Sequence, residues 1–410
     1  MNILINASNI KIGGGVQVTD YICNAIIEPS LLQVTNAKTS TYKQKFPEHK
    51  FFIVLSSYLS KTKEKLSLCN DIKVYTYDIK NNFTTLLLGR DCFLDDLIKE
   101  NKVDCVITVF GPSRWVPKVR HLCGFAMAQL ILRDSPFFSI CSLREKFYWK
   151  YVFSISRKLL FQKCSKLFYS ENKYISQKVE SLFHNSQCFT ITNYYNPIYE
   201  NPKLWKNKTL NKFDGITLLN ISSSYSYKNL QISLRVAKVL EERYPDFKFR
   251  FVFSVKKEDF LNSEYVKNGL NHPRGKKEKK MYDLSLEHFV FLGKVDLEEC
   301  PSLYQQSDFV FVPTLMESFT ALYPESFKMQ KPLLTSDLPF AKGLCGNAAE
   351  YFSPLDAEDI AEKIYSLANN PNKQKELILA GEKQLLTYDN NTQRINKLLK
   401  RATGFFDKLA

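Results

Sequence analysis

Short apolar runs alternate with helix-like stretches along this chain of 410 residues, and they do so in two successive series. Candidate strands of the first series lie at 2–7, 51–56, 103–110 and 121–126, and those of the second at 216–222, 247–254, 288–293, 308–313 and 332–336. Strands that alternate with helices favour an α/β fold with largely parallel sheets. The chain is also longer than one hydrophobic core usually supports. The sequence therefore predicts two α/β domains in tandem.

The break between the two series lies around residues 193–214, where Asn-Pro steps and polar residues interrupt the periodic pattern. We expect an N-terminal domain over 1–195 and a C-terminal domain over 196–385, each doubly wound and Rossmann-like. The helical residues 386–410 are expected to pack back on the N-terminal domain. Open α/β sheets bind ligands beyond the carboxyl ends of their strands, so the two domains are expected to face each other across a binding cleft.

The first residues, the longest apolar run and the cysteines indicate where in the cell the protein is expected. The first residues lack the basic and apolar regions of a signal peptide. The longest nearly apolar run, 122–132, is shorter than the roughly 20 residues that span a bilayer. Ten cysteines are scattered without a C-x-x-C pair, which favours reduced thiols. These features predict a cytoplasmic protein without a transmembrane helix.

The formal net charge of +15 favours partners that carry negative charge. Nucleic acid is not expected, because no RNP, zinc-finger or helix-turn-helix pattern occurs. Residues 142–169 mix basic and aromatic side chains in a helical rhythm. Two interpretations fit them: a helix on an anionic membrane surface, or an ordinary helix with a solvated basic face. The irregular stretch 256–287 is predicted to be a surface loop.

Two glutamates follow the apolar run 308–313. Glu317 and Glu325 are separated by seven residues, and Pro324 predicts that a helix starts there. On a single helix the two carboxylates would lie roughly 12 Å apart along the axis, too far for a glycosidase pair. Glu317 is therefore expected in a loop and Glu325 in a first helical turn. There they could bind hydroxyls at different points of one extended ligand. Two surface glutamates are the alternative.

The surrounding residues 290–364 resemble the donor-binding half of the retaining GT-B glycosyltransferases of family 4, also called group 1. The shared pattern is a strand, a helix, a strand, E-x7-E, Lys-Pro, Ser-Asp-Leu-Pro and Gly-Asn-Ala-Ala. The segment YKNL at 227–230 extends it. The N-terminal half is similar only in its glycine loop, with Gly14 and Gly15, and in FGPSRW at 110–115.

The resemblance implies roles for several residues. Glu317 would hold hydroxyls of the donor sugar, and Glu325 the ribose hydroxyls of its nucleotide. Lys228, after the strand at 216–222, matches the lysine that binds the donor phosphates. A cation beside a helix N-terminus suits a diphosphate on physical grounds also, although a solvated lysine is the alternative. Gly14 and Gly15 would let backbone N–H groups approach the diphosphate or the acceptor.

Four positions depart from the family pattern. Its Glu-Gly-Phe-Gly is Glu317-Ser318-Phe319-Thr320 here, so side chains stand where the donor sugar should meet the backbone. Ser223 replaces an arginine that commonly partners the lysine. The family's His-Asp pair is missing, and His121 is the nearest candidate for substrate contact, although a lone histidine on a strand is more often structural.

These residues lead to a functional hypothesis: metal-independent transfer of a sugar from a nucleotide-sugar donor, with retention of configuration. No D-x-D pair of metal-dependent transferases occurs, and no cofactor is expected. The acceptor would be a glycan or lipid-linked oligosaccharide of bacterial surface polysaccharide, such as O-antigen or capsule, met at the inner face of the membrane. Alternatives are a catalytically impaired, sugar-nucleotide-binding subunit of a glycan-assembly complex, and a GT-B-type nucleotide-sugar epimerase.

Overall fold

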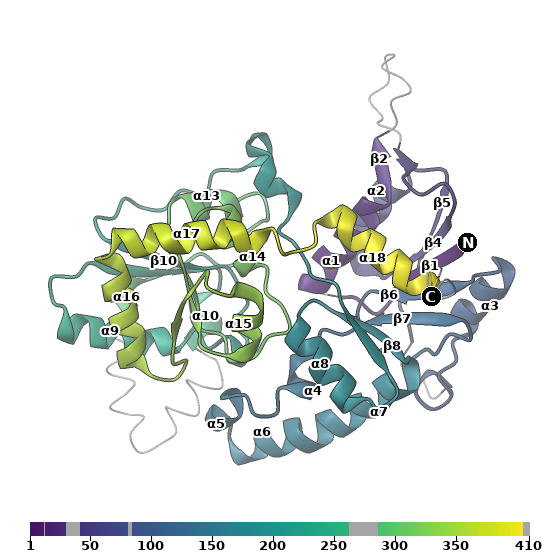
Figure 1. Ribbon diagram of the computed structural model, residues 1–410, viewed down its shortest axis with the longest axis horizontal. Helices are drawn as coiled ribbons and strands as arrows, with labels where there is room; N and C mark the ends of the chain where they lie inside the picture. Colours follow the sequence, from purple (N-terminus) through teal and green to yellow (C-terminus); the bar gives the residue numbers. More distant parts are fainter. Residues whose placement is uncertain (12, 30–41, 81–83, 262–285, 405–410) are drawn as a thin grey trace. The chain divides into compact units, whose positions relative to one another are not determined.

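The computed structural model describes residues 1–11, 13–29, 42–80, 84–261 and 286–404 (Figure 1). The chain divides into two compact units, and each contains one large sheet. Unit 1 comprises residues 1–131, 151–193 and 389–410, and unit 2 comprises 132–150 and 194–388. Residues 132–150 therefore group with unit 2, whereas the sequence predicts them to belong to the N-terminal domain.

The sheet of unit 1 is entirely parallel and has seven strands in the order β5-β4-β1-β6-β7-β8-β9. Their bounds are Asn2–Ala7 (β1), Lys50–Leu55 (β4), Ile72–Thr76 (β5), Cys105–Thr108 (β6), Arg120–Gly124 (β7), Leu167–Ser170 (β8) and Gln187–Thr190 (β9). The strand order reverses between β1 and β6. Between Ala25 and Lys50 along the chain, the strands β2 (Ile27–Pro29) and β3 (Tyr42–Gln44) form a separate, short antiparallel pair.

Helices pack on both faces of this sheet, because alternate residues of each strand point to opposite faces and both sets are apolar. Ile3 and Ile5 of β1 share one core with α1 (Gly14–Ala25), α2 (Ser60–Leu66) and α18 (Asn391–Thr403). Leu4 shares the other core with α3 (Cys92–Glu100). Among the described residues of unit 1, the other α-helices are α4 (Ala128–Ile131), α7 (Ser154–Cys164) and α8 (Lys173–Leu182).

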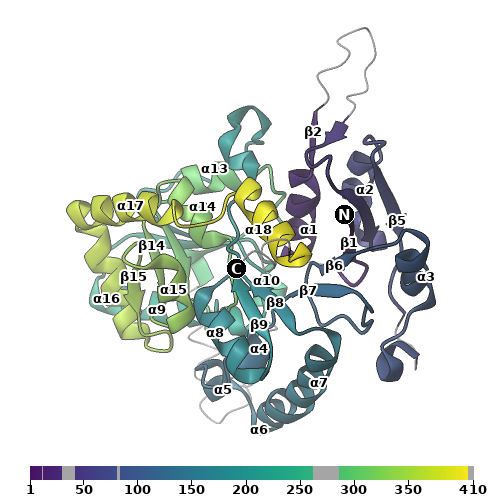
Figure 2. The same cartoon turned by 45° about the vertical axis from the view of Figure 1, so that its right-hand side comes forward.

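The sheet of unit 2 is also entirely parallel, with six strands in the order β12-β11-β10-β13-β14-β15. Of these strands, β14 and β15 are labelled in Figure 2. Their bounds are Ile216–Asn220 (β10), Phe249–Phe253 (β11), Phe289–Phe291 (β12), Phe309–Val312 (β13), Leu333–Ser336 (β14) and Glu350–Phe352 (β15). The order reverses between β10 and β13. The carboxyl ends of two such strands are where an open α/β sheet forms its binding crevice.

Around this sheet, α9 (Ile232–Arg243) and α16 (Ala357–Ala368) pack together over the apolar side chains of β10, β11 and β13. Helix α14 (Leu322–Lys328) packs against β13, β14 and α17 (Pro371–Leu385). In the part of unit 2 that the structure describes, the other α-helices are α5 (Phe137–Ile140), α6 (Leu143–Phe147), α10 (Lys257–Leu261), α13 (Cys300–Gln305) and α15 (Pro339–Cys345).

The predicted α/β fold with parallel sheets in two domains is confirmed, and every strand expected from the sequence is present with slightly shifted ends. Four strands of the two large sheets were not predicted: β5, β8, β9 and β15. The helix at 142–169 ends at Cys164, and β8 follows it. Most of the predicted loop 256–287 lies outside the described residues, while its start forms α10.

No helix in the described ranges is long and apolar enough to cross a lipid bilayer. All ten cysteines are free thiols, and nine of them are buried. The nine buried cysteines are small core side chains, and Cys92 is exposed.

Candidate functional site

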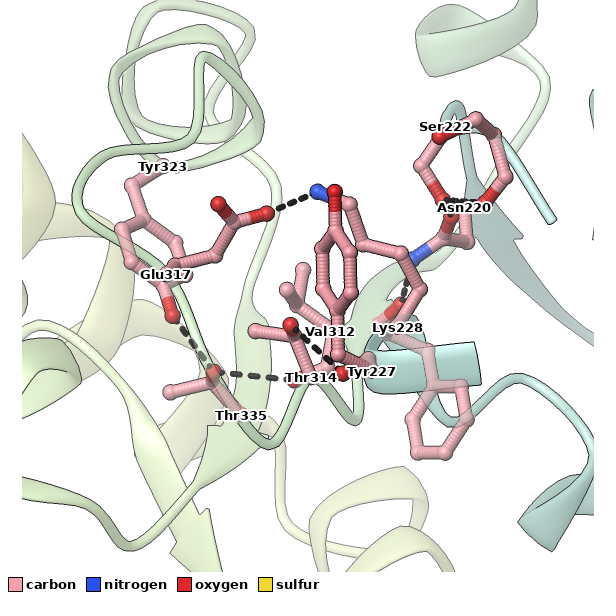
Figure 3. Close-up of polar contacts among 11 residues, drawn as sticks. Asn220, Ser222, Tyr227, Lys228, Val312, Thr314, Glu317, Tyr323 and Thr335 are labelled. Atoms are coloured by element: carbon pink, nitrogen blue, oxygen red, sulfur yellow. Dashed lines mark hydrogen bonds and ion pairs between the residues drawn. The ribbon is translucent and has the colours of Figure 1, made fainter. Parts of the chain in front are cut away.

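Lys228 and Glu317 meet at the reversal of strand order in unit 2. Lys228 lies in the loop after β10, and Glu317 lies in the loop after the neighbouring strand β13. The Lys228 ammonium donates to the Glu317 carboxylate, and the two side chains are only 15% and 12% exposed (Figure 3). Two residues that are 89 positions apart thus form one ion pair at the carboxyl edge of the sheet.

Hydrogen bonds between the two loops hold this ion pair. The carbonyl oxygen of Tyr227 accepts from the backbone N–H of Leu315 at 2.8 Å and from the hydroxyl of Thr314 at 3.2 Å (Figure 3). In the two strands that precede these loops, the Asn220 side-chain amide of β10 donates to the carbonyl of Phe311 of β13 at 2.7 Å. These bonds fix the backbone on either side, so Lys228 and Glu317 are positioned by their loops as well as by their charges.

The loop that carries Glu317 is tied to a third strand. The Thr335 hydroxyl of β14 donates to the carbonyl of Val312 at 3.0 Å, and it shares a 3.0 Å hydrogen bond with the Tyr323 hydroxyl (Figure 3). Tyr323 belongs to α14, so the strand end, the loop and the helix form one bonded unit. Sequence reasoning missed Thr314, Tyr323 and Thr335, because a hydroxyl in an apolar run gives no sign of its partner.

Segment 132–150 also contributes to this region of unit 2. The Ser135 hydroxyl donates to the carbonyl of Leu315 at 2.7 Å. The ring of Phe137 packs edge-on against Tyr227 with centroids 6.3 Å apart. Tyr225, half exposed, stacks on the same Tyr227 ring. The residues beside Lys228 and Glu317 therefore include aromatic rings that the sequence did not single out.

Burial and the neighbouring ammonium act in opposite directions on the pKa of Glu317. Burial raises the pKa of its carboxyl, and the ammonium of Lys228 opposes that rise. Lys228 therefore favours the ionised, acceptor-only form of the carboxylate against the effect of burial. Any ligand that draws Lys228 away leaves Glu317 a stronger proton acceptor, ready to bind a hydroxyl group.

Glu325 lies in the first turn of α14, which begins at Leu322, two residues before the predicted start at Pro324. It is 7% exposed, and its carboxylate accepts from the Tyr304 hydroxyl at 2.9 Å. Burial raises the pKa of Glu325 to about 6, and the nearby hydroxyls of Tyr304 and Tyr199 lower it in part. Its neighbours are thus phenols of the 194–204 segment and α13, whereas Glu317 has an ammonium partner.

The helix terminus near Lys228 differs from the expectation. Lys228 ends a short 3-10 turn, Ser226–Lys228, and Asn229 follows it with a φ of 55°. Helix α9 begins only at Ile232, and the N–H groups of Ile232, Ser233 and Leu234 bond carbonyls three residues back. These N–H groups are therefore already engaged, so the positive charge offered to a ligand here is that of Lys228 itself.

Ser318 and Thr320 are buried, at 6% and 7% exposure, and both have negative φ. The backbone of this loop therefore does not require glycine at either position. Phe319 between them packs against Tyr388 with ring centroids 6.2 Å apart. Ser223 is exposed on the loop after β10. The part of these four residues in donor binding stays a prediction.

The predicted residues of the N-terminal half lie in unit 1. Gly14 and Gly15 open α1 directly after β1, at the reversal of strand order in that sheet. A Cβ on Gly14 would meet no atom within 4 Å, so the backbone there is open to approach. The side-chain amide of Asn9 donates to the carbonyl of Phe110 at 2.7 Å and ties this loop to the one after β6.

His121 is a buried residue of β7. One ring nitrogen lies 2.8 Å from the Thr108 hydroxyl and the other 2.8 Å from the carbonyl of Cys164. Burial lowers the pKa of the imidazole to about 4, so it is neutral at physiological pH. Both nitrogens are engaged inside unit 1, which favours the structural interpretation; a contact with substrate stays a prediction.

The sequence model of the family "Glycosyl transferases group 1" matches residues 203–384, all of them in unit 2. The fold of the whole chain is that of the GT-B glycosyltransferases, two parallel α/β domains in tandem. No curated protein matches the sequence.

Three similar solved structures illustrate the fold. A glycosyltransferase from Rickettsia africae ESF-5 is 16% identical, with a TM-score of 0.63 over 98% of this chain and 97% of the other. HepE from Anabaena, in complex with UDP and glucose, is 12% identical, with a TM-score of 0.62 over 97% and 98%. WaaG, a glycosyltransferase involved in lipopolysaccharide biosynthesis, is 12% identical, with a TM-score of 0.59 over 98% and 100%.

Proposed function

We propose that this protein is a retaining, metal-independent glycosyltransferase of family 4, and that Lys228, Glu317 and Glu325 bind its nucleotide-sugar donor. The observation that carries the proposal is the ion pair of Lys228 and Glu317 at the reversal of strand order in unit 2. A cation and a hydroxyl-binding carboxylate at one point suit a ligand that joins a diphosphate to a sugar. The match of residues 203–384 to the group 1 family supports the same assignment.

In this proposal, donor binding separates Lys228 from Glu317, and each of the two then contacts a different part of the donor. The diphosphate takes the ammonium of Lys228, and Glu317 turns to hydroxyls of the sugar. Glu325 binds the ribose, as the family resemblance implies. The bond between the anomeric carbon and the phosphate oxygen then breaks, while Lys228 stabilises the charge that develops on that oxygen. The acceptor oxygen bonds the anomeric carbon on the same face, and its proton passes to the departing phosphate.

We infer that the acceptor is a glycan or lipid-linked oligosaccharide of bacterial surface polysaccharide, met at the inner face of the membrane. WaaG, one of the similar structures, is described as acting in lipopolysaccharide biosynthesis, which supports this class of acceptor. UDP-sugars are the first donors to test, because HepE was solved with UDP. Gly14 and Gly15 would serve the acceptor or the far side of the diphosphate.

The test is the variant Lys228→Ala, assayed for donor hydrolysis and for transfer with a panel of UDP- and GDP-sugars. Loss of a preorganised positive charge is expected to lower turnover by about 10²–10³-fold. The matched control is Lys238→Ala, since Lys238 pairs with Glu242 on the exposed face of α9 in the same unit. The control is expected to keep wild-type turnover.

Wild-type turnover in Lys228→Ala would contradict the proposal. The variant must remain folded for the result to count, and an unchanged circular-dichroism melting curve checks this. The buried Ser318 and Thr320 side chains motivate one competing function, a subunit that binds sugar nucleotides without transferring sugar. Nucleotide binding by the wild type without hydrolysis or transfer of any donor would favour that subunit.

A further inference from the structure

A histidine and two glutamates meet at the amino edge of the unit 2 sheet, and we call them the histidine cluster. His288 directly precedes β12, and Glu287 is its neighbour in the chain. Glu241 lies in the last turn of α9, 47 residues before His288. One nitrogen or carboxylate oxygen from each of the three side chains lies within 4.8 Å of the other two. The fold of unit 2 thus gathers three side chains of the kinds that bind metal ions.

The ring of His288 is held in place by a residue outside the histidine cluster. Its Nδ1 atom lies 3.2 Å from the backbone carbonyl oxygen of Phe249, and the ring stacks on that of Phe249 with centroids 4.2 Å apart. A carbonyl oxygen can only accept, so Nδ1 carries the hydrogen that it donates. Metal-binding histidines are commonly oriented in this way, with one ring nitrogen donating to a backbone carbonyl and the other binding the metal. Nε2 is therefore the atom of His288 that is available as a ligand.

The Nε2 atom of His288 faces two negative charges. It lies 2.7 Å from an oxygen of Glu241 and 4.0 Å from an oxygen of Glu287. A neutral imidazole has one N–H, and Nδ1 uses it, so Nε2 presents a lone pair to these carboxylates. Among the described residues, neither glutamate forms an ion pair with a lysine or an arginine. A cation between the three side chains, either a proton or a metal ion, makes this arrangement favourable.

The spacing of the three ligand atoms suits a small divalent ion. Zinc binds imidazole nitrogen and carboxylate oxygen at about 2.0–2.2 Å in a tetrahedron, so two of its ligand atoms lie about 3.4 Å apart. The distances from Nε2 to the two carboxylates, 2.7 and 4.0 Å, lie on either side of this value. The side chains of Glu241 and Glu287 are 35% and 77% exposed, so both can make the small adjustment. Their exposure also lets water reach a fourth position on the ion.

We propose that Glu241, Glu287 and His288 bind a zinc ion, with water as the fourth ligand. The ion joins the last turn of α9 to the residues that open β12, and so stabilises unit 2. All strands of this sheet are parallel, and Lys228 follows the carboxyl end of β10, at the opposite edge from the histidine cluster. The zinc site is therefore separate from the candidate donor site. It has a structural role and leaves the proposed transfer reaction metal-independent.

Calorimetric titration of the full-length protein with zinc chloride at neutral pH tests the proposal, after a chelator has removed any bound metal. The titration uses a Cys92→Ser background, because Cys92 is an exposed thiol and thiolates also bind zinc. One zinc ion is expected to bind per chain and to raise the melting temperature, since it binds only the folded site. Magnesium is expected not to compete, because it prefers oxygen ligands to imidazole.

Two variants remove a ligand, and a third is their matched control. Glu287→Gln changes an exposed side chain and is expected to weaken zinc binding by at least about 10–100-fold, the loss seen when even an indirect partner of a metal is removed. His288→Ala is expected to abolish binding, but it also removes the stack on Phe249, so Glu287→Gln decides if that variant does not fold. The control is Glu48→Gln, because Glu48 is an exposed glutamate 3.7 Å from a histidine, His49. It is expected to bind zinc like its parent.

Three results would overturn the proposal: no zinc binding in the Cys92→Ser background, equal affinity after Glu287→Gln, or an equal loss in the Glu48→Gln control. Any of them would leave His288 and Glu241 as an ion pair held by a proton. Donor hydrolysis is expected to be unchanged in Glu287→Gln, because the histidine cluster lies at the edge of the sheet away from Lys228. Failure of the zinc site is therefore distinguishable from failure of the proposed transfer reaction.

Discussion

Two glutamates of the same motif are stabilised in different ways. Glu317 faces an ammonium, whereas Glu325 is buried beside phenol hydroxyls. Phenols donate hydrogen bonds but bring no positive charge, so they compensate only part of the cost of burying a carboxylate. The structure thus keeps Glu325 close to its protonation midpoint at mildly acidic pH, and ligand hydroxyls would add the hydrogen bonds that favour its ionised form.

Replacing Glu325 by glutamine is expected to stabilise unit 2 at neutral pH. The pKa of Glu325 is about 6 in the folded protein against 4.5 for an unperturbed glutamate. Between these values the folded state keeps a proton that the unfolded state has lost, so stability falls as pH rises across this window, by about 2 kcal/mol. Glu325→Gln removes this loss and can still accept from Tyr304. Urea unfolding at pH 4.5 and pH 7 measures the difference.

Glu376→Gln is the control for that measurement, because Glu376 is 70% exposed on α17. It is expected to leave the pH dependence of the free energy of unfolding as in the wild type. A Glu325→Gln protein no more stable than the wild type at pH 7 would contradict the inferred protonation of Glu325. Weaker nucleotide binding by the same variant would show that its carboxylate is retained for ligand binding at a cost in stability.

At the scale of elements, α18 is attached to unit 1 by polar contacts as well as by its apolar face. Arg394 donates to Glu171 at 2.9 Å, and the two side chains are 2% and 5% exposed. The backbone N–H of Thr192 donates to the Asp389 carboxylate, and the backbone N–H of Asp389 donates to the Thr192 hydroxyl. Thr192 and Asp389, which lie on either side of residues 194–388 along the chain, are therefore bonded to each other within unit 1.

Arg394→Ala is expected to lower the free energy of unfolding of unit 1 by about 3–5 kcal/mol, because it leaves the carboxylate of Glu171 buried without its charge partner. The double variant Glu171→Gln, Arg394→Met is expected to recover much of that loss, since no uncompensated charge remains. Chemical denaturation followed by circular dichroism measures both. Equal losses in the single and double variants would mean that packing of α18, and not the ion pair, carries the effect.

At the scale of the whole molecule, donor binding is expected to concern unit 2 first, since Lys228, Glu317 and Glu325 all belong to it. A ligand that binds only the folded state stabilises it, by about 2.7 kcal/mol at 100 times its Kd. For a domain of this size such a gain raises the melting temperature by roughly 5–10 °C.

A thermal-shift screen with UDP, GDP and their sugars measures this gain. We expect a shift with one nucleotide series in the wild type and in Lys238→Ala, and a much smaller one in Lys228→Ala, because the phosphates lose their cation. A shift of wild-type size in Lys228→Ala would remove this lysine from the nucleotide site.

Much of the architecture is determined by local sequence. Apolar runs such as 216–222 and 308–313 must be buried on both faces, which requires a parallel sheet covered by helices. The strands that the local pattern did not predict are short or contain polar residues. Strand β5 contains a lysine among its apolar residues, and β8 comes soon after a long helix whose residues are of similar kinds. Their strand conformation depends on pairing with neighbours, which is a tertiary interaction.

The candidate site also combines features that follow from local sequence with features that depend on tertiary packing. That Lys228 and Glu317 each follow a buried strand can be read from local sequence, because strand ends and loops are local features. Three further features depend on how the whole unit folds: these two strands are neighbours, Lys228 pairs with Glu317, and Glu325 lies among phenols. The physical reason is that parallel strands pair through crossovers of many residues, so the partners at a sheet edge are set by the packing of the whole unit.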